Sequence, residues 1–136
     1  MTDDFQLHEK LAADTIEVER WTFSRVLLMN DSHYPWLILV PQRPGLRDFD
    51  DLAEADLPVM TEEILRASRL LKTAFRPDKM NVAALGNQVP QLHIHVIARF
   101  TKDAAWPGPI WGVQPAKPYT DAELTERLAL LRDGGS

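Results

Sequence analysis

The chain has 136 residues, of which 45% are hydrophobic and 26% are charged, a composition typical of a soluble globular protein with a proper core. Its formal net charge of −5 at pH 7 argues against a protein whose main task is to bind nucleic acid, since a phosphate backbone needs a basic face. It contains no cysteine, which excludes disulfides, a thiol nucleophile and thiolate metal sites. The N-terminus is acidic and the chain lacks a long apolar run, so we expect no signal peptide, no membrane span and a cytoplasmic location.

The first forty residues predict a short helix followed by three strands. Residues 2–13 begin with capping side chains and carry a loose apolar side, which is typical of a helix, with His8 on its surface. Residues 15–19 alternate apolar and charged side chains and therefore predict a strand. Residues 24–30 and 36–40 are apolar runs of strand length, separated by a polar turn.

Residues 50–75 predict the long helix of the chain, because apolar side chains recur at helical spacing and indicate a face packed against a sheet. These apolar residues are Leu57, Met60, Ile64, Leu71 and Phe75. Pro58 is compatible with a helix only in its first turn. Two further strands are predicted at residues 80–85 and 91–100, and a capping box predicts a final helix over residues 120–132.

Trp106 and Trp111 lie on a proline-rich loop between the last strand and the final helix. Two interpretations of this loop are open. It is either a lid over a nucleotide base or packing that ties the C-terminus down.

The element order β-β-β-α-β-β, with local hairpins and one long helix, predicts an α+β domain. We expect an antiparallel five-stranded sheet with the long helix and shorter terminal helices, in a single domain over residues 1–136.

The strand predicted at residues 91–100 contains the strongest candidates for a functional site. Side chains alternate between the two faces of an extended chain, so Gln91, His93 and His95 share one face and aliphatic side chains share the other. Imidazole is the side chain that titrates near neutrality when unperturbed. Three interpretations are open: a solvated face, half of a metal site, or phosphorus chemistry in which one imidazole attacks and its neighbour holds a phosphate oxygen.

The metal interpretation is the weakest of the three. Zinc needs three or four ligands, and the remaining histidines, His8 and His33, are not at ligand spacing from any partner. The loop at residues 86–90 favours phosphorus chemistry, because the amides of Asn87 and Gln88 next to two histidines suit phosphate oxygens. A plain hairpin turn would use the same Gly-Asn dipeptide.

Residues 89–97, VPQLHIHVI, resemble the signature strand of the histidine triad (HIT) family, which reads His-x-His-x-His followed by two apolar residues. In this match His93 takes the position of the family's nucleophile and His95 takes the last triad position. Gln91 takes the first position, and there the sequence departs from the triad. Asn87 matches a position where the family often has a glutamine near the α-phosphate.

The two strands upstream are similar to the family's leading strands. The family residue that matches Asn30 or Asp31 lies near the ribose, and Trp36 stands where the family commonly has a further histidine. The resemblance covers most of residues 15–112. It implies the same α+β fold and a homodimer whose sheets join edge to edge.

The resemblance implies nucleotidyl transfer at the α-phosphate of a nucleotide that carries a polyphosphate-like or phosphoramidate leaving group. The catalytic residues it implies are His93 as nucleophile, His95 as donor to a phosphate oxygen, and Gln91. The acceptor expected for the other ring nitrogen of His93 is the backbone carbonyl of Gln91. The residues expected to bind the nucleotide are Asn30, Asp31, Asn87, Gln88 and Arg99. This scheme needs no metal and no other cofactor.

Gln91 limits the chemistry, because an amide cannot shuttle a proton near neutrality. Good leaving groups such as polyphosphate are therefore expected to be preferred to amines. Two other functions remain open: a nucleotide-binding or sensing module that has lost turnover, marked by Gln91 and Trp36, and a metal-dependent hydrolase with His93 and His95 as ligands.

Overall fold

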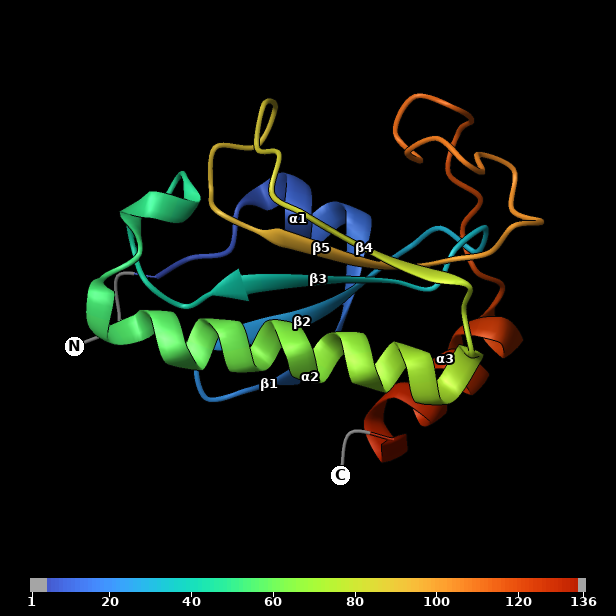
Figure 1. Ribbon diagram of the computed structural model, residues 1–136, viewed down its shortest axis with the longest axis horizontal. Helices are drawn as coiled ribbons and strands as arrows, with labels where there is room; N and C mark the ends of the chain where they lie inside the picture. Colours follow the sequence, from blue (N-terminus) through green and yellow to red (C-terminus); the bar gives the residue numbers. More distant parts are fainter. Residues whose placement is uncertain (1–4, 135–136) are drawn as a thin grey trace.

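A five-stranded antiparallel sheet forms the centre of the computed structural model, which describes residues 5–134 (Figure 1). The strands lie in the order β1-β2-β3-β5-β4. Their bounds are β1 Thr15–Arg20, β2 Ser24–Met29, β3 Trp36–Pro41, β4 Lys79–Ala83 and β5 Ile94–Arg99. Strands β1, β2 and β3 pair in sequence, and β5 lies between β3 and β4. This arrangement confirms the predicted α+β class with an antiparallel five-stranded sheet.

The central strands β3 and β5 are buried at every position, because both faces of the sheet are covered. Helix α2, Leu57–Phe75, crosses the front face in Figure 1. Its buried side chains belong to one hydrophobic cluster with the aliphatic face predicted for the histidine strand. This cluster includes Met60, Ala67 and Leu71 from α2 and Leu92, Ile94 and Val96 from the strand segment.

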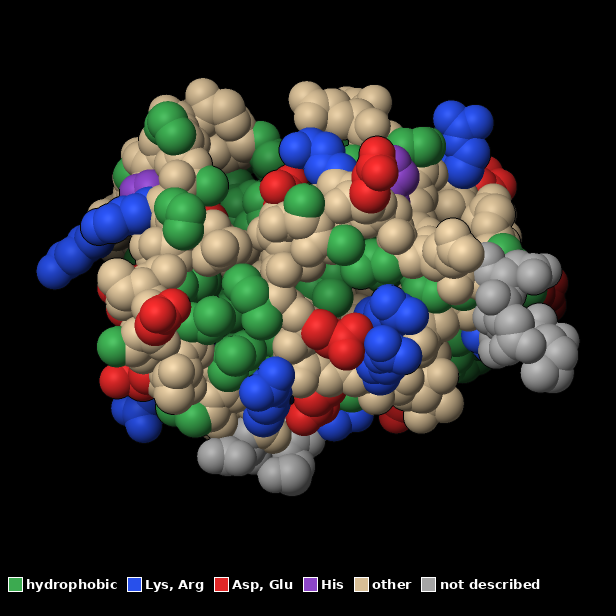
Figure 2. Space-filling model, turned by 180° about the vertical axis from the view of Figure 1, so that it is seen from behind, with side chains coloured by type: hydrophobic (Ala, Val, Ile, Leu, Met, Phe, Trp, Pro, Cys, Tyr) green, Lys and Arg blue, Asp and Glu red, His purple; other side chains and the backbone are tan. Residues whose placement is uncertain are grey.

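The opposite face of the sheet is covered by the N-terminal segment with the short helix α1, Glu9–Asp14, and by the loop that follows β5. Leu11 from α1 and Ile110 from the loop join a second hydrophobic cluster with the outward-facing residues of β3 and β5. In Figure 2, which shows the molecule from behind, hydrophobic side chains reach the surface between charged ones. The histidine strand is thus enclosed on both sides.

The long helix begins later than predicted. Two 3₁₀ turns, η1 Phe49–Asp51 and η2 Glu54–Asp56, replace its expected first turns. Helix α2 then begins at Leu57, with Pro58 in its first turn, where a missing N–H costs no intrahelical bond. Leu57 is 38% exposed, so its predicted place on the packed face is wrong. The helix ends at Phe75, and Arg76 caps it with a left-handed φ of 51°.

The N-terminal helix is shorter than predicted. Residues 2–4 of the prediction lie outside the described residues, and residues 5–8 are not helical. Helix α1 begins only at Glu9, because the backbone of residues 6–8 is bound instead by the side chain of Gln91. His8 is the N-cap of α1 and not, as predicted, a residue on the surface of a helix.

Strand β5 begins at Ile94, whereas the sequence predicted a strand from residue 91. Residues 91–93 leave the sheet ladder, and the Leu92 amide donates to the Leu46 carbonyl at 2.9 Å. The strand predicted at residues 80–85 is likewise shifted and runs as β4 over Lys79–Ala83. Consequently His93 lies immediately before β5, and its backbone is not part of the hydrogen-bonded ladder of the sheet.

The final helix α3, Asp121–Gly134, packs on its own domain. The predicted capping box is present: the Glu123 amide donates to Thr120 Oγ1 at 3.2 Å, and the Thr120 amide donates to the Glu123 carboxylate at 2.9 Å. Leu131 is buried in the cluster beneath α2, and Arg132 donates to the Val18 carbonyl at 2.9 Å. Within residues 5–134, none of the helices has the length and apolar character needed to cross a membrane.

Candidate active site

His93 and His95 lie edge to face, with ring centroids 4.9 Å apart and planes at 68°. His93 precedes β5, and His95 is its second residue, paired with Ile38 of β3 and Ala83 of β4. Each histidine is only 6% exposed. The two rings therefore lie side by side, and both are largely buried.

The ring of His93 is oriented by a backbone carbonyl. Its Nδ1 lies 2.7 Å from the Gln91 carbonyl oxygen, and because that oxygen only accepts, Nδ1 carries the proton. Nε2 of the neutral ring then has a free lone pair. Burial lowers the pKa of His93, although the hydrogen bond to the Gln91 carbonyl acts in the opposite direction. This confirms the expected acceptor, and a neutral ring with an unprotonated Nε2 suits a nucleophile near pH 7.

The ring of His95 has the opposite proton arrangement. Trp36 Nε1, an obligate donor, lies 3.0 Å from His95 Nδ1, which must accept, so the ring proton sits on Nε2. Burial, together with the nearby charge of His93, lowers the pKa of His95 to about 3. His95 is therefore a neutral ring with a fixed N–H donor throughout the physiological pH range.

Trp111 closes over His95 from the loop that follows β5. Its ring centroid lies 5.2 Å from that of His95 and 6.2 Å from that of Trp36, both at steep angles. Trp106, in contrast, lies beside the Arg99 guanidinium, 5.7 Å from the ring centroid. Trp111 therefore covers a histidine and Trp106 packs against Arg99, while the lid over a nucleotide base stays a prediction.

A cavity of about 310 Å³ opens onto both histidines, a size suited to a small ligand. Its lining consists of the β4–β5 loop residues Leu85, Gly86, Asn87, Gln88 and Val89 with His93, His95 and Trp111. Gly86 turns this loop with a φ of 73°, which favours glycine. The structure therefore brings the predicted Asn87 and Gln88 together with His93 and His95.

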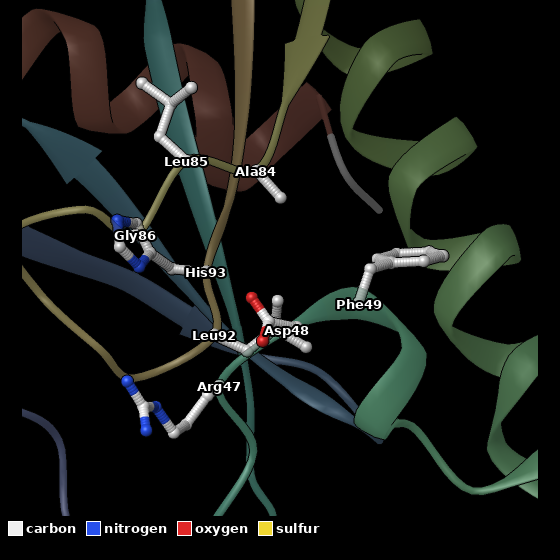
Figure 3. Close-up of a pocket in the computed structure, with 8 residues that line it drawn as sticks. All are labelled: Arg47, Asp48, Phe49, Ala84, Leu85, Gly86, Leu92 and His93. Carbon is white, nitrogen blue, oxygen red and sulfur yellow. The ribbon is translucent and has the colours of Figure 1, made fainter.

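His93 also lines a smaller cavity of about 70 Å³ (Figure 3). It is lined by Arg47, Asp48, Phe49, Ala84, Leu85, Gly86, Leu92 and His93. In Figure 3 the Arg47 guanidinium and the His93 ring extend to the same side of the segment that carries Leu92. His93 thus contributes to the lining of two cavities.

Asn30 and Asp31 are placed differently from the prediction. Asn30 Oδ1 accepts from the Tyr119 amide at 2.9 Å, and Asp31 Oδ1 lies 2.7 Å from His33 Nδ1 and accepts from the Lys117 amide at 3.3 Å. Neither residue lines the cavity of the two histidines. Their side chains fasten the C-terminal segment to the end of β2, and this placement gives no support to the expected contact with ribose.

Arg99 is also placed away from the histidines. Its side chain is 1% exposed and binds Asp103 through two hydrogen bonds of 2.8 and 3.0 Å and Asn81 through one of 2.8 Å. Burial would raise the pKa of Asp103, but hydrogen bonding and charge from Arg99 lower it to about 2. The alternation of side chains correctly puts Arg99 on the same face of the strand as His95. The two residues are four positions apart, however, which corresponds to about 13 Å along a strand. The expected contact with the leaving group is therefore not supported.

Gln91 holds the N-terminal segment instead of facing the cavity of the two histidines. Its Oε1 accepts from the His8 amide at 2.8 Å, and its Nε2 donates to the Gln6 carbonyl at 2.8 Å. With both ends of the amide occupied by backbone groups, the side chain takes no part in the histidine cavity. Only the backbone carbonyl of Gln91 touches His93.

Sequence reasoning missed Trp36 and Trp111 as contacts of His95, and His8 as a neighbour of Gln91. These contacts join residues that are far apart in the sequence: His95 and Trp111 are separated by 16 positions, and His8 and Gln91 by 83. Trp36 was visible only as the residue that replaces a family histidine. Among residues 5–134, no group of three or more His, Cys, Asp and Glu side chains is placed to hold a metal ion.

Comparison with known proteins gives a consistent result. The family model described as "HIT domain" matches residues 16–102. A histidine triad protein structure from Bradyrhizobium japonicum is 45% identical, with a TM-score of 0.94 and coverage of 97% of this chain and 98% of that one. A second, from Marinobacter aquaeolei, is 47% identical, with a TM-score of 0.93 and coverage of 96% and 95%. A third, from Sinorhizobium meliloti, is 39% identical, with a TM-score of 0.95 and coverage of 98% and 99%. Comparison with curated proteins finds no match.

Replacing Trp36 by phenylalanine tests the fixed tautomer of His95. In the wild type we expect nitrogen-15 NMR to show the Nε2–H form of His95, without titration between pH 5 and 9, since a pKa of about 3 leaves the ring neutral above that value. In Trp36→Phe the Nδ1 lone pair loses its donor, and we expect a mixture of both neutral tautomers. A pure Nε2–H form in the variant would contradict the role given to Trp36.

Proposed function

This chain belongs to the HIT family, and from that premise we propose that it is a cytoplasmic nucleotide hydrolase that cleaves at the α-phosphate through a nucleotidyl intermediate on His93. One observation carries the proposal above all others. His93 Nδ1 donates to the Gln91 carbonyl at 2.7 Å, so that Nε2 is an oriented, unprotonated nucleophile. The neighbouring cavity of about 310 Å³ offers space for the reacting phosphate.

In the first step, Nε2 of His93 attacks the α-phosphorus and forms an N–P bond. The bond from phosphorus to the leaving group breaks, and its electron pair departs with the leaving group. The Nδ1–H hydrogen bond to the Gln91 carbonyl stabilises the positive charge that the ring acquires. In the second step, water attacks phosphorus and gives up one proton to the solvent. The N–P bond breaks with its electron pair returning to Nε2, a nucleoside monophosphate leaves, and His93 returns to its neutral form.

His95 serves this reaction as a neutral donor. Trp36 occupies its Nδ1, and therefore the Nε2–H group is the one available to a non-bridging phosphate oxygen. Because His95 does not titrate near pH 7, its Nε2–H group remains a hydrogen-bond donor at every stage of the reaction. Asn87 and Gln88 line the same cavity and supply further neutral donors.

The protonation state of the site favours leaving groups that need no proton. His93 is engaged as nucleophile, His95 remains neutral because its pKa is about 3, and the Gln91 amide cannot transfer a proton. A phosphate leaving group departs as a stable anion, whereas an amine must be protonated to depart. We therefore assign the substrate class as phosphoric anhydrides, such as dinucleoside polyphosphates, in preference to phosphoramidates.

Turnover of diadenosine tetraphosphate and of adenosine 5′-phosphoramidate tests this assignment. We expect kcat/KM to be higher for the tetraphosphate by about 10²-fold or more, the usual size of general-acid assistance. His93→Ala should abolish both activities, and a chelator should leave the wild type unchanged because His93 acts as nucleophile. Faster phosphoramidate cleavage would contradict the assignment. Nucleotide binding without turnover would select a sensing module, and chelator-sensitive turnover would select the metal-dependent alternative.

We further propose that two copies of the chain pair through β4. This strand lies at the end of the strand order, with β5 as its partner, and its outer edge carries free backbone groups that another strand can bind. Val82 on β4 is 49% exposed and Leu85 beyond it is 46% exposed, a large value for aliphatic side chains. An antiparallel copy of β4 would cover both.

Light scattering of the wild type and of Val82→Lys tests the pairing. We expect a mass of two chains for the wild type and a shift towards one chain for the variant, because like charges would meet across the joined edge. Leu65→Lys is the matched control, since Leu65 is 44% exposed on helix α2 and should leave the dimer intact. A wild type that runs as one chain at all concentrations would exclude this dimer.

A further inference from the structure

The amide of Gln91 fastens a remote histidine beside the nucleophile. It binds the backbone of the N-terminal segment at two points, the Gln6 carbonyl and the His8 amide, each at 2.8 Å. The same residue binds the His93 ring through its backbone carbonyl at 2.7 Å. Gln91 therefore links His8 and His93, although they are far apart in the sequence.

The ring of His8 presents a free donor. As N-cap of α1, its Nδ1 accepts from the Lys10 amide at 3.1 Å, so that the neutral ring carries its proton on Nε2. Among the described residues, Nε2 has no hydrogen-bond partner. The two rings are also close enough to interact: besides burial, which has the larger effect, the charge of His8 lowers the pKa of His93.

An open cavity of about 550 Å³ lies beside this ring. It is lined by Gln6, His8, Gly45, Leu46, Arg47, Pro90 and Gln91. Arg47 lines both this cavity and the small cavity of His93, where Figure 3 shows it. Among the described residues that line the larger cavity, basic side chains are present and acidic ones are absent, while Asp48 lines only the smaller cavity.

We propose that His8 and Arg47 form a subsite for the anionic part of the substrate that lies beyond the α-phosphate. The inference rests on the proposed function and names the ligand as the polyphosphate chain of a nucleotide. When the bond from the α-phosphorus to the bridging oxygen breaks, that oxygen keeps the electron pair. His8 Nε2–H and the Arg47 guanidinium then stabilise the added charge on the departing phosphate, without a proton transfer.

Gln91 has a positioning role in this subsite. At the position of the family's first histidine, it places a histidine from another segment of the chain next to the nucleophile. The site thus regains a third imidazole, which binds the leaving group where the triad's first residue is missing.

Two substrates with different leaving groups test the subsite. The leaving group of diadenosine tetraphosphate carries a polyphosphate chain. The leaving group of adenosine 5′-(p-nitrophenyl phosphate) is a phenolate without phosphate. For Arg47→Gln and for His8→Asn, which keeps an N-cap acceptor but shortens the side chain, we expect kcat/KM for the tetraphosphate to fall about 10- to 100-fold. For the nitrophenyl ester we expect a change of less than about 3-fold, since its leaving group makes no such contact.

Arg69→Gln is the matched control, because it removes the same charge from an exposed position on α2 and should change neither activity. Equal losses on both substrates in Arg47→Gln and His8→Asn would overturn the subsite. Gln91→Ala should reproduce the selective loss of His8→Asn. In the double variant that carries both of these changes, kcat/KM for the tetraphosphate should be no more than about 2-fold below that of either single variant. Fully additive losses would overturn the positioning role of Gln91.

A binding measurement separates the subsite from the proposed hydrolase activity. Inorganic tripolyphosphate is added to the wild-type protein while the histidine ring signals are followed by NMR. We expect the His8 signals to shift and those of His33, on the β2–β3 turn, to stay, with weaker binding in Arg47→Gln. If the wild type cleaves neither nucleotide but His8 still responds, the hydrolase proposal fails and the subsite stands. An unshifted His8 overturns the subsite.

Discussion

The hydrogen bond from His93 Nδ1 to the Gln91 carbonyl, 2.7 Å long, is the interaction on which the site depends. It forms because residues 91–93 leave the sheet ladder before β5 begins at Ile94. A residue inside the ladder would have offered its carbonyl to a neighbouring strand instead. The buried sheet then holds the ring in place, in the lining of the cavity, and the lone pair of Nε2 is free. The backbone carbonyl of Gln91 thus links the course of the chain before β5 to the orientation of the proposed nucleophile.

The second constraint is the burial of the two rings, each of which is 6% exposed. Burial lowers the pKa of both histidines, and Trp36 fixes the remaining proton of His95 on Nε2. One imidazole therefore offers a lone pair and the other offers an N–H, and neither supplies a proton near pH 7. This division of roles follows from their hydrogen-bond partners, since the two side chains are chemically identical. It favours a leaving group that departs as an anion, which agrees with the presence of His8 and Arg47 in the lining of the larger cavity.

Periodicity predicted most of the fold, because alternation and helical spacing report which side chains are buried. The five strands were found within three residues at each end, and the long helix was found apart from its first seven predicted residues. Alternation placed the two histidines on one face, and the family resemblance gave them their expected roles. Contacts between distant segments were beyond sequence reasoning. The alternation of side chains gave the correct face for Arg99 but not its distance from His95. No pattern in the neighbouring sequence indicated that Asp103 would bind Arg99. The pairing of Trp36 with His95 depends on the register of β3 against β5, which no sequence pattern states.

The most direct test is the intact mass of the protein after mixing with diadenosine tetraphosphate and quenching in mild alkali, where a phosphoramidate survives better than in acid. The account predicts the added mass of one adenylyl group in the wild type, assigned to His93 by peptide mapping, and none in His93→Ala. Adenylate release that persists in His93→Ala, or an adenylyl group on another residue, would contradict it. The nucleotide products in the same samples show whether each protein turned over.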